Sequence, residues 1–103
     1  MGELKNVAKK NDLPSGKAMA VDLNGKRIAL FNIDGTYYAI DDECTHAGGS
    51  LSEGELEGTV VTCPWHGATF DVSNGAVLSA PAFDKVNSYS VKVAGEEIQI
   101  ELP

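Results

Sequence analysis

The clearest candidates for chemistry in this chain are its two cysteines and two histidines. They form two short clusters, Cys44 with His46 in C-T-H and Cys63 with His66 in C-P-W-H, separated by residues 47–62. Thiolates and imidazoles are the ligands of zinc sites and of some iron–sulfur clusters. The spacing therefore predicts a metal site built from these four residues. A disulfide between the two cysteines is possible in principle, but the flanking histidines argue against it.

Two kinds of centre could use this ligand set. A structural zinc site usually pairs like ligands, C-x2–4-C with H-x3–5-H, and C-x-H is a tight spacing for it. In a mixed-ligand [2Fe-2S] cluster, two cysteines hold one iron and two histidines hold the other. Each loop must then reach both irons, which one Cys and one His per loop allows. The residues favour the cluster, with a structural zinc-binding module as the alternative from a different class.

Short strands joined by tight turns are expected to position the two loops. Alternating apolar runs are separated by dipeptides that favour hairpins, namely Asn24-Gly25, Asp34-Gly35, Asn74-Gly75 and Ala94-Gly95. No window shows a helical period. We therefore expect an all-β fold, either a sandwich or a barrel of antiparallel strands. The first ligand pair follows the run 36–40 and the second follows 59–62, so each pair should lie in a loop held by a strand.

Composition and charge restrict the expected partners. The 103 residues carry a formal net charge of −7. Nucleic acid and anionic membrane are poor partners for an acidic surface, whereas a basic patch on another protein is a good one. No apolar run approaches the ~20 residues that span a bilayer, and residues 1–11 lack the apolar core of a signal peptide. We expect a cytoplasmic monomer that binds neither nucleic acid nor membrane.

The double motif resembles the Rieske [2Fe-2S] motif, C-x-H…C-x-x-H-G, and the resemblance covers about residues 21–102. Further matches are Gly48, Leu51-Ser52-x-Gly54, Phe70-Asp71, Asn74-Gly75, Pro81-Ala82 and Tyr89-x-Val91. The resemblance implies a single Rieske domain over residues 1–103, with a small cluster-binding subdomain at about 41–83 inserted into a larger base. It implies one [2Fe-2S] cluster per chain, with Cys44 and Cys63 on the inner iron and His46 and His66 on the outer, solvent-facing iron.

Four other positions depart from the high-potential members of that family. Those proteins carry a disulfide beside the cluster where this chain has Gly49 and Trp65. They also place Ser and Tyr hydroxyls where this chain has Ala68 and Phe70. Hydrogen bonds to sulfur stabilise the reduced cluster, so their loss should lower the reduction potential toward about −150 mV. The chain therefore resembles the Rieske-type ferredoxins of bacterial aromatic-ring dioxygenase systems.

The same resemblance implies an electron carrier and not an enzyme. With both histidines used as cluster ligands, the two-His-one-carboxylate site of a mononuclear oxygenase iron cannot be built. The chain also lacks a G-x-G-x-x-G fingerprint and is too short for a flavin domain. It is expected to pass single electrons from a flavin-dependent NAD(P)H reductase to a terminal oxygenase in aromatic hydrocarbon catabolism. The close alternative is the small Rieske-like subunit of an assimilatory nitrite reductase, a group whose members often lack the ligands.

The acidic run 41–43 lies directly before the first ligand pair. It is interpreted either as a solvated loop or as a docking patch beside the exposed histidines.

Overall fold

The structure is a computed structural model that describes residues 3–23, 25–42, 50–64, 68–79 and 86–102. These residues form ten strands and two short 3-10 turns, η1 (Lys10–Asp12) and η2 (Leu51–Glu53), with no α-helix among them. Every strand pair is antiparallel. The prediction of an all-β fold is confirmed. Within the described ranges, no helix has the length and apolar character needed to cross a membrane.

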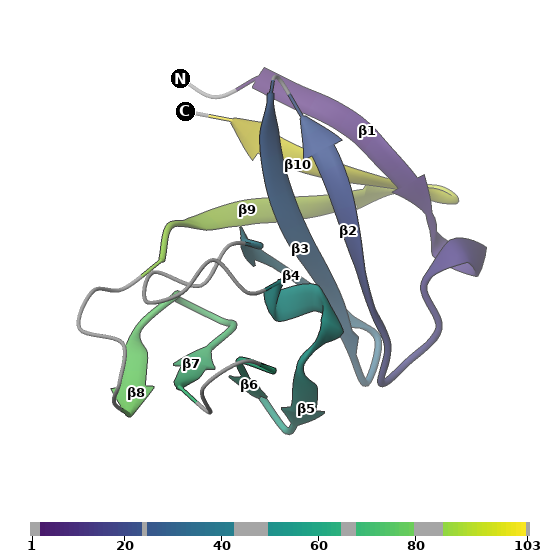
Figure 1. The fold of residues 1–103 in the computed structure, drawn as a ribbon. Coiled ribbons are helices and arrows are strands. Elements are labelled where there is room, and N and C mark those ends of the chain that lie inside the picture. Colours follow the sequence, from purple (N-terminus) through teal and green to yellow (C-terminus); the bar gives the residue numbers. More distant parts are fainter. Residues whose placement is uncertain (1–2, 24, 43–49, 65–67, 80–85, 103) are drawn as a thin grey trace.

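Six strands form the larger sheet, in the order β1-β10-β9-β4-β3-β2 (Figure 1). Their bounds are Glu3–Lys9 for β1, Ala18–Leu23 for β2, Lys26–Ile33 for β3, Thr36–Asp41 for β4, Ser88–Ala94 for β9 and Glu97–Leu102 for β10. The first and last strands of the chain pair with each other. β4 pairs with β9, which joins the N-terminal strands to the C-terminal hairpin.

The smaller sheet has four short strands in sequence order. They are β5 (Glu55–Glu57), β6 (Val60–Thr62), β7 (Thr69–Asp71) and β8 (Val77–Ser79). Figure 1 shows this sheet at the end of the molecule away from β1. The whole small sheet is inserted between β4 and β9, two neighbouring strands of the larger sheet. The limits 41 and 83 for a cluster-binding subdomain stay a prediction.

The hairpin between β3 and β4 has the turn that its sequence predicts. Ile33 pairs with Thr36, which leaves Asp34 and Gly35 as the two turn residues. Their φ angles are 52° and 88°. An Asp-Gly pair suits this turn because aspartate tolerates positive φ better than most residues and glycine adopts it freely.

β3 is buried on both faces and separates two apolar clusters. Ala29 and Phe31 belong to a cluster that includes residues of the small sheet and its adjoining turns, namely Leu51, Val61, Cys63, Ala68, Phe70 and Val72. Ile28 and Leu30 belong to the second cluster, which lies within the larger sheet and includes Leu13, Ala39, Ile98 and Ile100. Because neighbouring strand residues point to opposite faces, one continuous apolar run supplies both clusters.

Candidate metal centre

One of the four predicted ligands lies within the described residues. Cys63 follows β6 directly, whereas Cys44, His46 and His66 lie outside the described residues, as do Trp65 and Pro81. Among the described residues, no group of three or more His, Cys, Asp or Glu side chains is placed to hold a metal ion. The described part of the candidate centre is therefore Cys63 together with the bases of the two loops that carry the predicted ligands.

Cys63 is a free cysteine with an exposed fraction of 1%. Its amide donates a 2.7 Å hydrogen bond to the carbonyl of Ala68, which closes the second loop at its base. The thiol lies in the same apolar cluster as Leu51, Ala68 and Phe70, each fully buried. A thiol in these surroundings is shielded from solvent, electrophiles and oxidants. Such a position suits the inner, water-excluded ligand of a metal centre.

Ala68 and Phe70 bring no hydroxyl group to the surroundings of Cys63. Both side chains have an exposed fraction of 0% and belong to the same apolar cluster as the thiol. These are the two positions at which the sequence departs from the Ser and Tyr donors of high-potential relatives. The structure therefore places both positions in the same apolar cluster as the one predicted ligand that it describes.

Asp42 closes the base of the first loop. Its carbonyl accepts a 2.6 Å hydrogen bond from the amide of Leu51, and its Oδ1 accepts one of 2.8 Å from the amide of Ser52. Its Oδ2 lies 2.9 Å from Nε of Arg27 in an ion pair. Residues 43–50 are thus a closed excursion whose two ends meet at one buried residue, which has an exposed fraction of 1%.

Gly54 brings the exit of the first loop against the entry of the second. A Cβ atom at Gly54 would lie only 2.0 Å from the carbonyl oxygen of Thr62, the residue before Cys63. Only glycine allows the backbone to approach this closely. The match of Gly54 to the family pattern therefore has a structural reason. The bases of the two ligand loops are in contact.

Asp41 anchors the chain that follows residues 80–85. Its amide donates to the carbonyl of Asn87 at 3.0 Å, and its Oδ2 accepts a 3.1 Å hydrogen bond from the amide of Asn87. Its Oδ1 accepts a 2.5 Å hydrogen bond from the hydroxyl of Tyr89. Burial and this hydrogen bond to a carboxylate raise the pKa of Tyr89 above its usual value, because both disfavour the phenolate.

Both interpretations of the acidic run are wrong for Asp42, and Asp41 has a structural role that neither of them included. Asp42 is buried and paired, and Asp41 is partly buried and bonded to β9. Glu43 lies outside the described residues. The two carboxylates are structural anchors for the loops, and the burial of Asp42 removes it from any solvated loop or docking patch.

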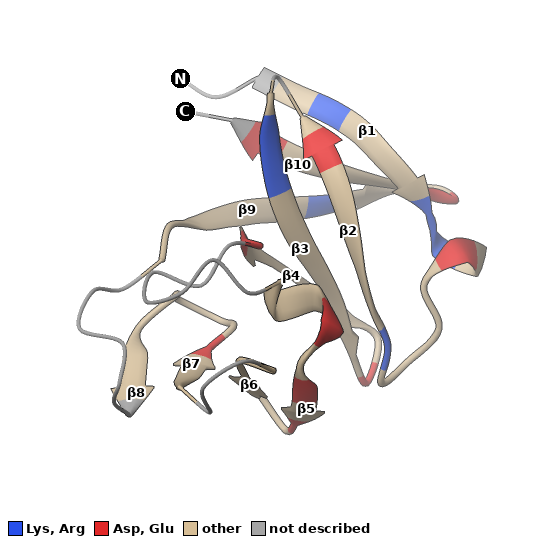
Figure 2. Cartoon of the chain, in the orientation of Figure 1, with Lys and Arg blue, Asp and Glu red and all other residues tan. Residues whose placement is uncertain are grey.

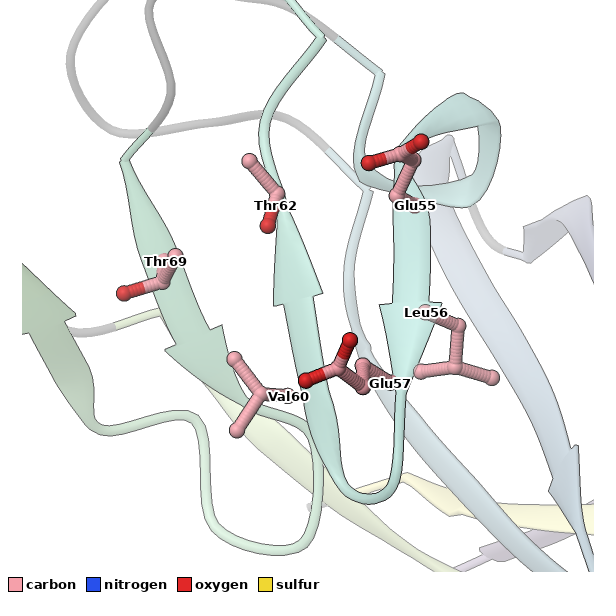
Figure 3. Close-up of a pocket in the computed structure, with 6 residues that line it drawn as sticks. All are labelled: Glu55, Leu56, Glu57, Val60, Thr62 and Thr69. Atoms are coloured by element: carbon pink, nitrogen blue, oxygen red, sulfur yellow. The ribbon is translucent and has the colours of Figure 1, made fainter.

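The outer face of the small sheet carries a hollow of about 490 Å³. Figure 3 shows Glu55 and Glu57 on β5 beside Val60 and Thr62 on β6, and Leu56 and Thr69 complete the lining. None of these residues is a Cys or His. Two carboxylates line the hollow, so it belongs to the acidic surface of the small sheet.

Charge is distributed unevenly along the chain. All eight Lys and Arg residues lie outside residues 28–84, a stretch that contains nine Asp and Glu. Figure 2 shows basic positions on β1, β3 and β9 and acidic positions on η2, β5 and β7. The end of the molecule that carries the small sheet is therefore acidic, and the Lys and Arg residues within the described ranges lie on the larger sheet and its turns.

Solved structures of known proteins share this fold over nearly the whole chain. The ferredoxin of carbazole 1,9a-dioxygenase from Nocardioides aromaticivorans IC177 has a TM-score of 0.93 at 30% identity, covering 97% of this chain and 98% of that one. A chain of the complex of reduced oxygenase and oxidised ferredoxin in carbazole 1,9a-dioxygenase has a TM-score of 0.88 at 33% identity, covering 94% and 91%. A Mycobacterium tuberculosis protein described as an NADH-dependent nitrite reductase small subunit has a TM-score of 0.90, covering 100% and 97%, but at 23% identity this shows the fold alone.

Curated relatives agree with this likeness in sequence. The ferredoxin component of the naphthalene 1,2-dioxygenase system of Pseudomonas aeruginosa is 38% identical over 91 residues, covering 88% of each chain. The 3-phenylpropionate/cinnamic acid dioxygenase ferredoxin subunit of Shigella boydii is 45% identical over 93 residues, covering 89% of this chain and 87% of that one. The profile of the Rieske [2Fe-2S] domain matches residues 3–90. The resemblance seen in the motif is confirmed, and the chain belongs to the Rieske [2Fe-2S] domain family.

Proposed function

We propose that this chain is a Rieske-type ferredoxin, a one-electron carrier between a flavin-dependent NAD(P)H reductase and the terminal oxygenase of an aromatic-ring dioxygenase system. The observation that carries this proposal is its identity of 38% and 45%, over nearly the full length, to ferredoxin components of two such systems. The likeness to a chain of an oxygenase–ferredoxin complex supports the oxygenase as one partner. The chain itself is an electron-transfer component and not the catalytic enzyme.

The proposed ligands are Cys44 and Cys63 on one iron and His46 and His66 on the other. Three observations support this set: Cys63 is a buried free thiol, each ligand loop is closed at its base, and the two bases are in contact. When bound, the cluster takes up and releases single electrons. The chain's own contribution is to hold the loops by hydrogen bonds and to exclude water around Cys63 with apolar side chains.

We also propose that the centre works near the low end of the range for Rieske clusters, about −150 mV. The support is the absence of a hydroxyl at Ala68 and Phe70, both packed in the cluster of side chains that contains Cys63. Without such donors, the additional negative charge of the reduced state is less well stabilised.

The proposal includes a monomer in the cytoplasm that binds neither nucleic acid nor membrane. The acidic stretch 28–84 supports a protein partner with a basic surface and is unsuited to anionic polymers.

The two alternatives have less support. The nitrite reductase subunit shares the fold at 23% identity, whereas relatives at 38% and 45% are dioxygenase ferredoxins. A structural zinc module is disfavoured by the match to a [2Fe-2S] family over most of the chain.

The purified protein provides the first test. We expect two iron atoms and two labile sulfides per chain, and a rhombic EPR signal after dithionite reduction. His46→Cys and His66→Cys should each shift the spectrum toward that of an all-cysteine ferredoxin or lose the cluster. A colourless protein with one zinc would overturn the proposal, and unchanged spectra in both variants would contradict the ligand set.

The electron-carrier role has a separate test. NADH-dependent reduction of the protein by the reductase of a related dioxygenase system should be followed by oxidation on addition of its oxygenase and aromatic substrate. Reduction by a nitrite reductase large subunit, without reaction toward the oxygenase, would favour the alternative.

A further inference from the structure

Asp42 is the one described residue that holds both ends of the first ligand loop. It ends the chain segment that leads into residues 43–50, and it accepts hydrogen bonds from Leu51 and Ser52 where that excursion returns. Its own amide donates to the carbonyl of Arg27 at 3.0 Å. Asp42 makes hydrogen bonds through both its main chain and its side chain, so it is fixed to β3 on one side and to η2 on the other.

The burial of Asp42 is informative because a buried carboxylate is costly unless it is paired and hydrogen-bonded. Oδ1 accepts the Ser52 amide, and Oδ2 is paired with Arg27. Oδ2 makes no hydrogen bond among the described residues, and the Nε of Arg27 at 2.9 Å is its ion-pair partner. The Arg27 side chain is 57% exposed, so its charge stays partly hydrated while it covers the carboxylate.

We propose that Asp42 is a positioning residue for the metal centre, and that its ion pair with Arg27 helps to hold Asp42 in place. By fixing the two ends of residues 43–50, Asp42 restricts the placement of Cys44 and His46, and the contact between Gly54 and Thr62 extends the restraint to Cys63. The proposal rests on the proposed ligand set. It adds two residues, Asp42 and Arg27, that bind no metal in that set.

The test compares Asp42→Ala, Asp42→Asn and Arg27→Gln with the wild-type protein loaded with its cluster. The readouts are the EPR line shape, the reduction potential and the rate of iron loss to a chelator. We expect broader EPR features, because the loop samples more conformations, and an altered potential. Iron loss should be about tenfold faster in Asp42→Ala, since a hydrogen bond lost to a buried group is commonly worth a factor of ten.

Control variants separate positioning from general stability and from charge. Ile98→Val removes buried volume from the larger sheet and should lower the unfolding midpoint while leaving the EPR spectrum unchanged. Asp71→Asn removes one negative charge from a turn of the small sheet, where Oδ1 accepts hydrogen bonds from Ser73, and should leave the chelator rate unchanged. Arg27→Lys keeps the positive charge that Arg27→Gln removes. Its EPR spectrum and its rate of iron loss should therefore lie closer to those of the wild-type protein.

Each outcome has a defined meaning. If Asp42→Ala does not fold, Arg27→Gln carries the test, because it leaves the loop sequence intact. Wild-type spectra and iron loss in both Asp42→Asn and Arg27→Gln would overturn this inference alone. A wild-type protein that lacks the rhombic signal would overturn the ligand set and this inference with it.

Discussion

The hydroxyl of Tyr89 on β9 donates a 2.5 Å hydrogen bond to Oδ1 of Asp41 at the end of β4. The other carboxylate oxygen of Asp41 accepts the amide of Asn87. Nζ of Lys26 lies 3.5 Å from the same hydroxyl. The bond therefore ties the strand that precedes the first ligand loop to the strand that follows residues 80–85.

Tyr89 should make stability depend on pH in alkaline solution. Burial and the hydrogen bond to Asp41 raise its pKa in the folded protein, while the unfolded chain loses the phenol proton near pH 10. The unfolded state then binds fewer protons, so the free energy of unfolding should fall as the pH rises above about 10. Below that pH this group adds no dependence. Urea unfolding between pH 8 and 11 measures the effect.

Tyr89→Phe is the matched comparison for that measurement. It should lower stability at neutral pH by about 1 kcal/mol through loss of one hydrogen bond, and it should weaken the alkaline decline. Parallel alkaline declines in the two proteins would exclude the assigned role of Tyr89.

Gly54→Ala should displace η2 from β6. The new Cβ would lie 2.0 Å from the carbonyl oxygen of Thr62, a contact that requires the backbone to move. Overpacking of this kind costs about 1–3 kcal/mol. We expect a lower thermal midpoint and reduced iron retention, since Cys63 follows Thr62 directly.

Gly58→Ala is the control for Gly54→Ala. Gly58 has a φ of 59° and open space where a Cβ atom would lie, so alanine there adds backbone strain without a contact. It should lower the thermal midpoint and leave iron retention unchanged. If both alanines affect iron retention equally, the contact with Thr62 is not what couples the two loops.

Ala68→Ser should raise the reduction potential. A hydroxyl at this buried position beside Cys63 could donate a hydrogen bond to a sulfur atom, which stabilises the reduced state. If this hydrogen bond stabilises the reduced state by a net amount of about 1–1.5 kcal/mol, the reduction potential rises by roughly 40–65 mV for a one-electron couple. Protein-film voltammetry measures the shift. Ala29→Ser places a hydroxyl in the same apolar cluster from β3 and should destabilise the protein without raising the potential.

Electron transfer to the partner proteins should slow as salt increases. The stretch 28–84 carries nine carboxylates and no Lys or Arg, so attraction to a basic partner surface would be screened. Stopped-flow rates at 0.02 and 0.3 M NaCl measure this effect. The double change Glu55→Gln with Glu57→Gln should reduce the rate at low salt more than Glu96→Gln with Glu97→Gln. If the two double variants slow the reaction equally, the rate depends on the net charge of the protein and not on the acidic face of the small sheet.

Local features of the fold could be predicted from the sequence because their causes are local. The turn at Asp34 and Gly35 depends on two residues whose conformational preferences are known. The β5 strand was not predicted, because Glu55–Glu57 is too short to show an alternating pattern and becomes a strand only by pairing with β6. The two-sided burial of β3 likewise depends on the small sheet that covers one face.

The candidate site could be predicted only for the residues that define a motif. Cys63 was identified from its spacing, and the structure shows its burial. The structural role of Asp42 was missed because an aspartate before a loop is usually solvated. Its partner Arg27 lies on β3, which is not the strand that leads into the loop. Their contact depends on the pairing of Ile28 with Asp41 across β3 and β4, which no local pattern reveals.

The anchoring of the first loop to β3 has a consequence for protein engineering. Grafting residues 43–50 onto another β-domain would require residues from two separate parts of the sequence. Asp42 and Ser52 flank the loop and would be transferred with it, but Arg27 would not. A graft that omits an arginine at the equivalent place on the neighbouring strand would carry a buried, uncompensated carboxylate into its new host. The smallest transferable unit is therefore the pair of strands β3 and β4 together with the loop and η2.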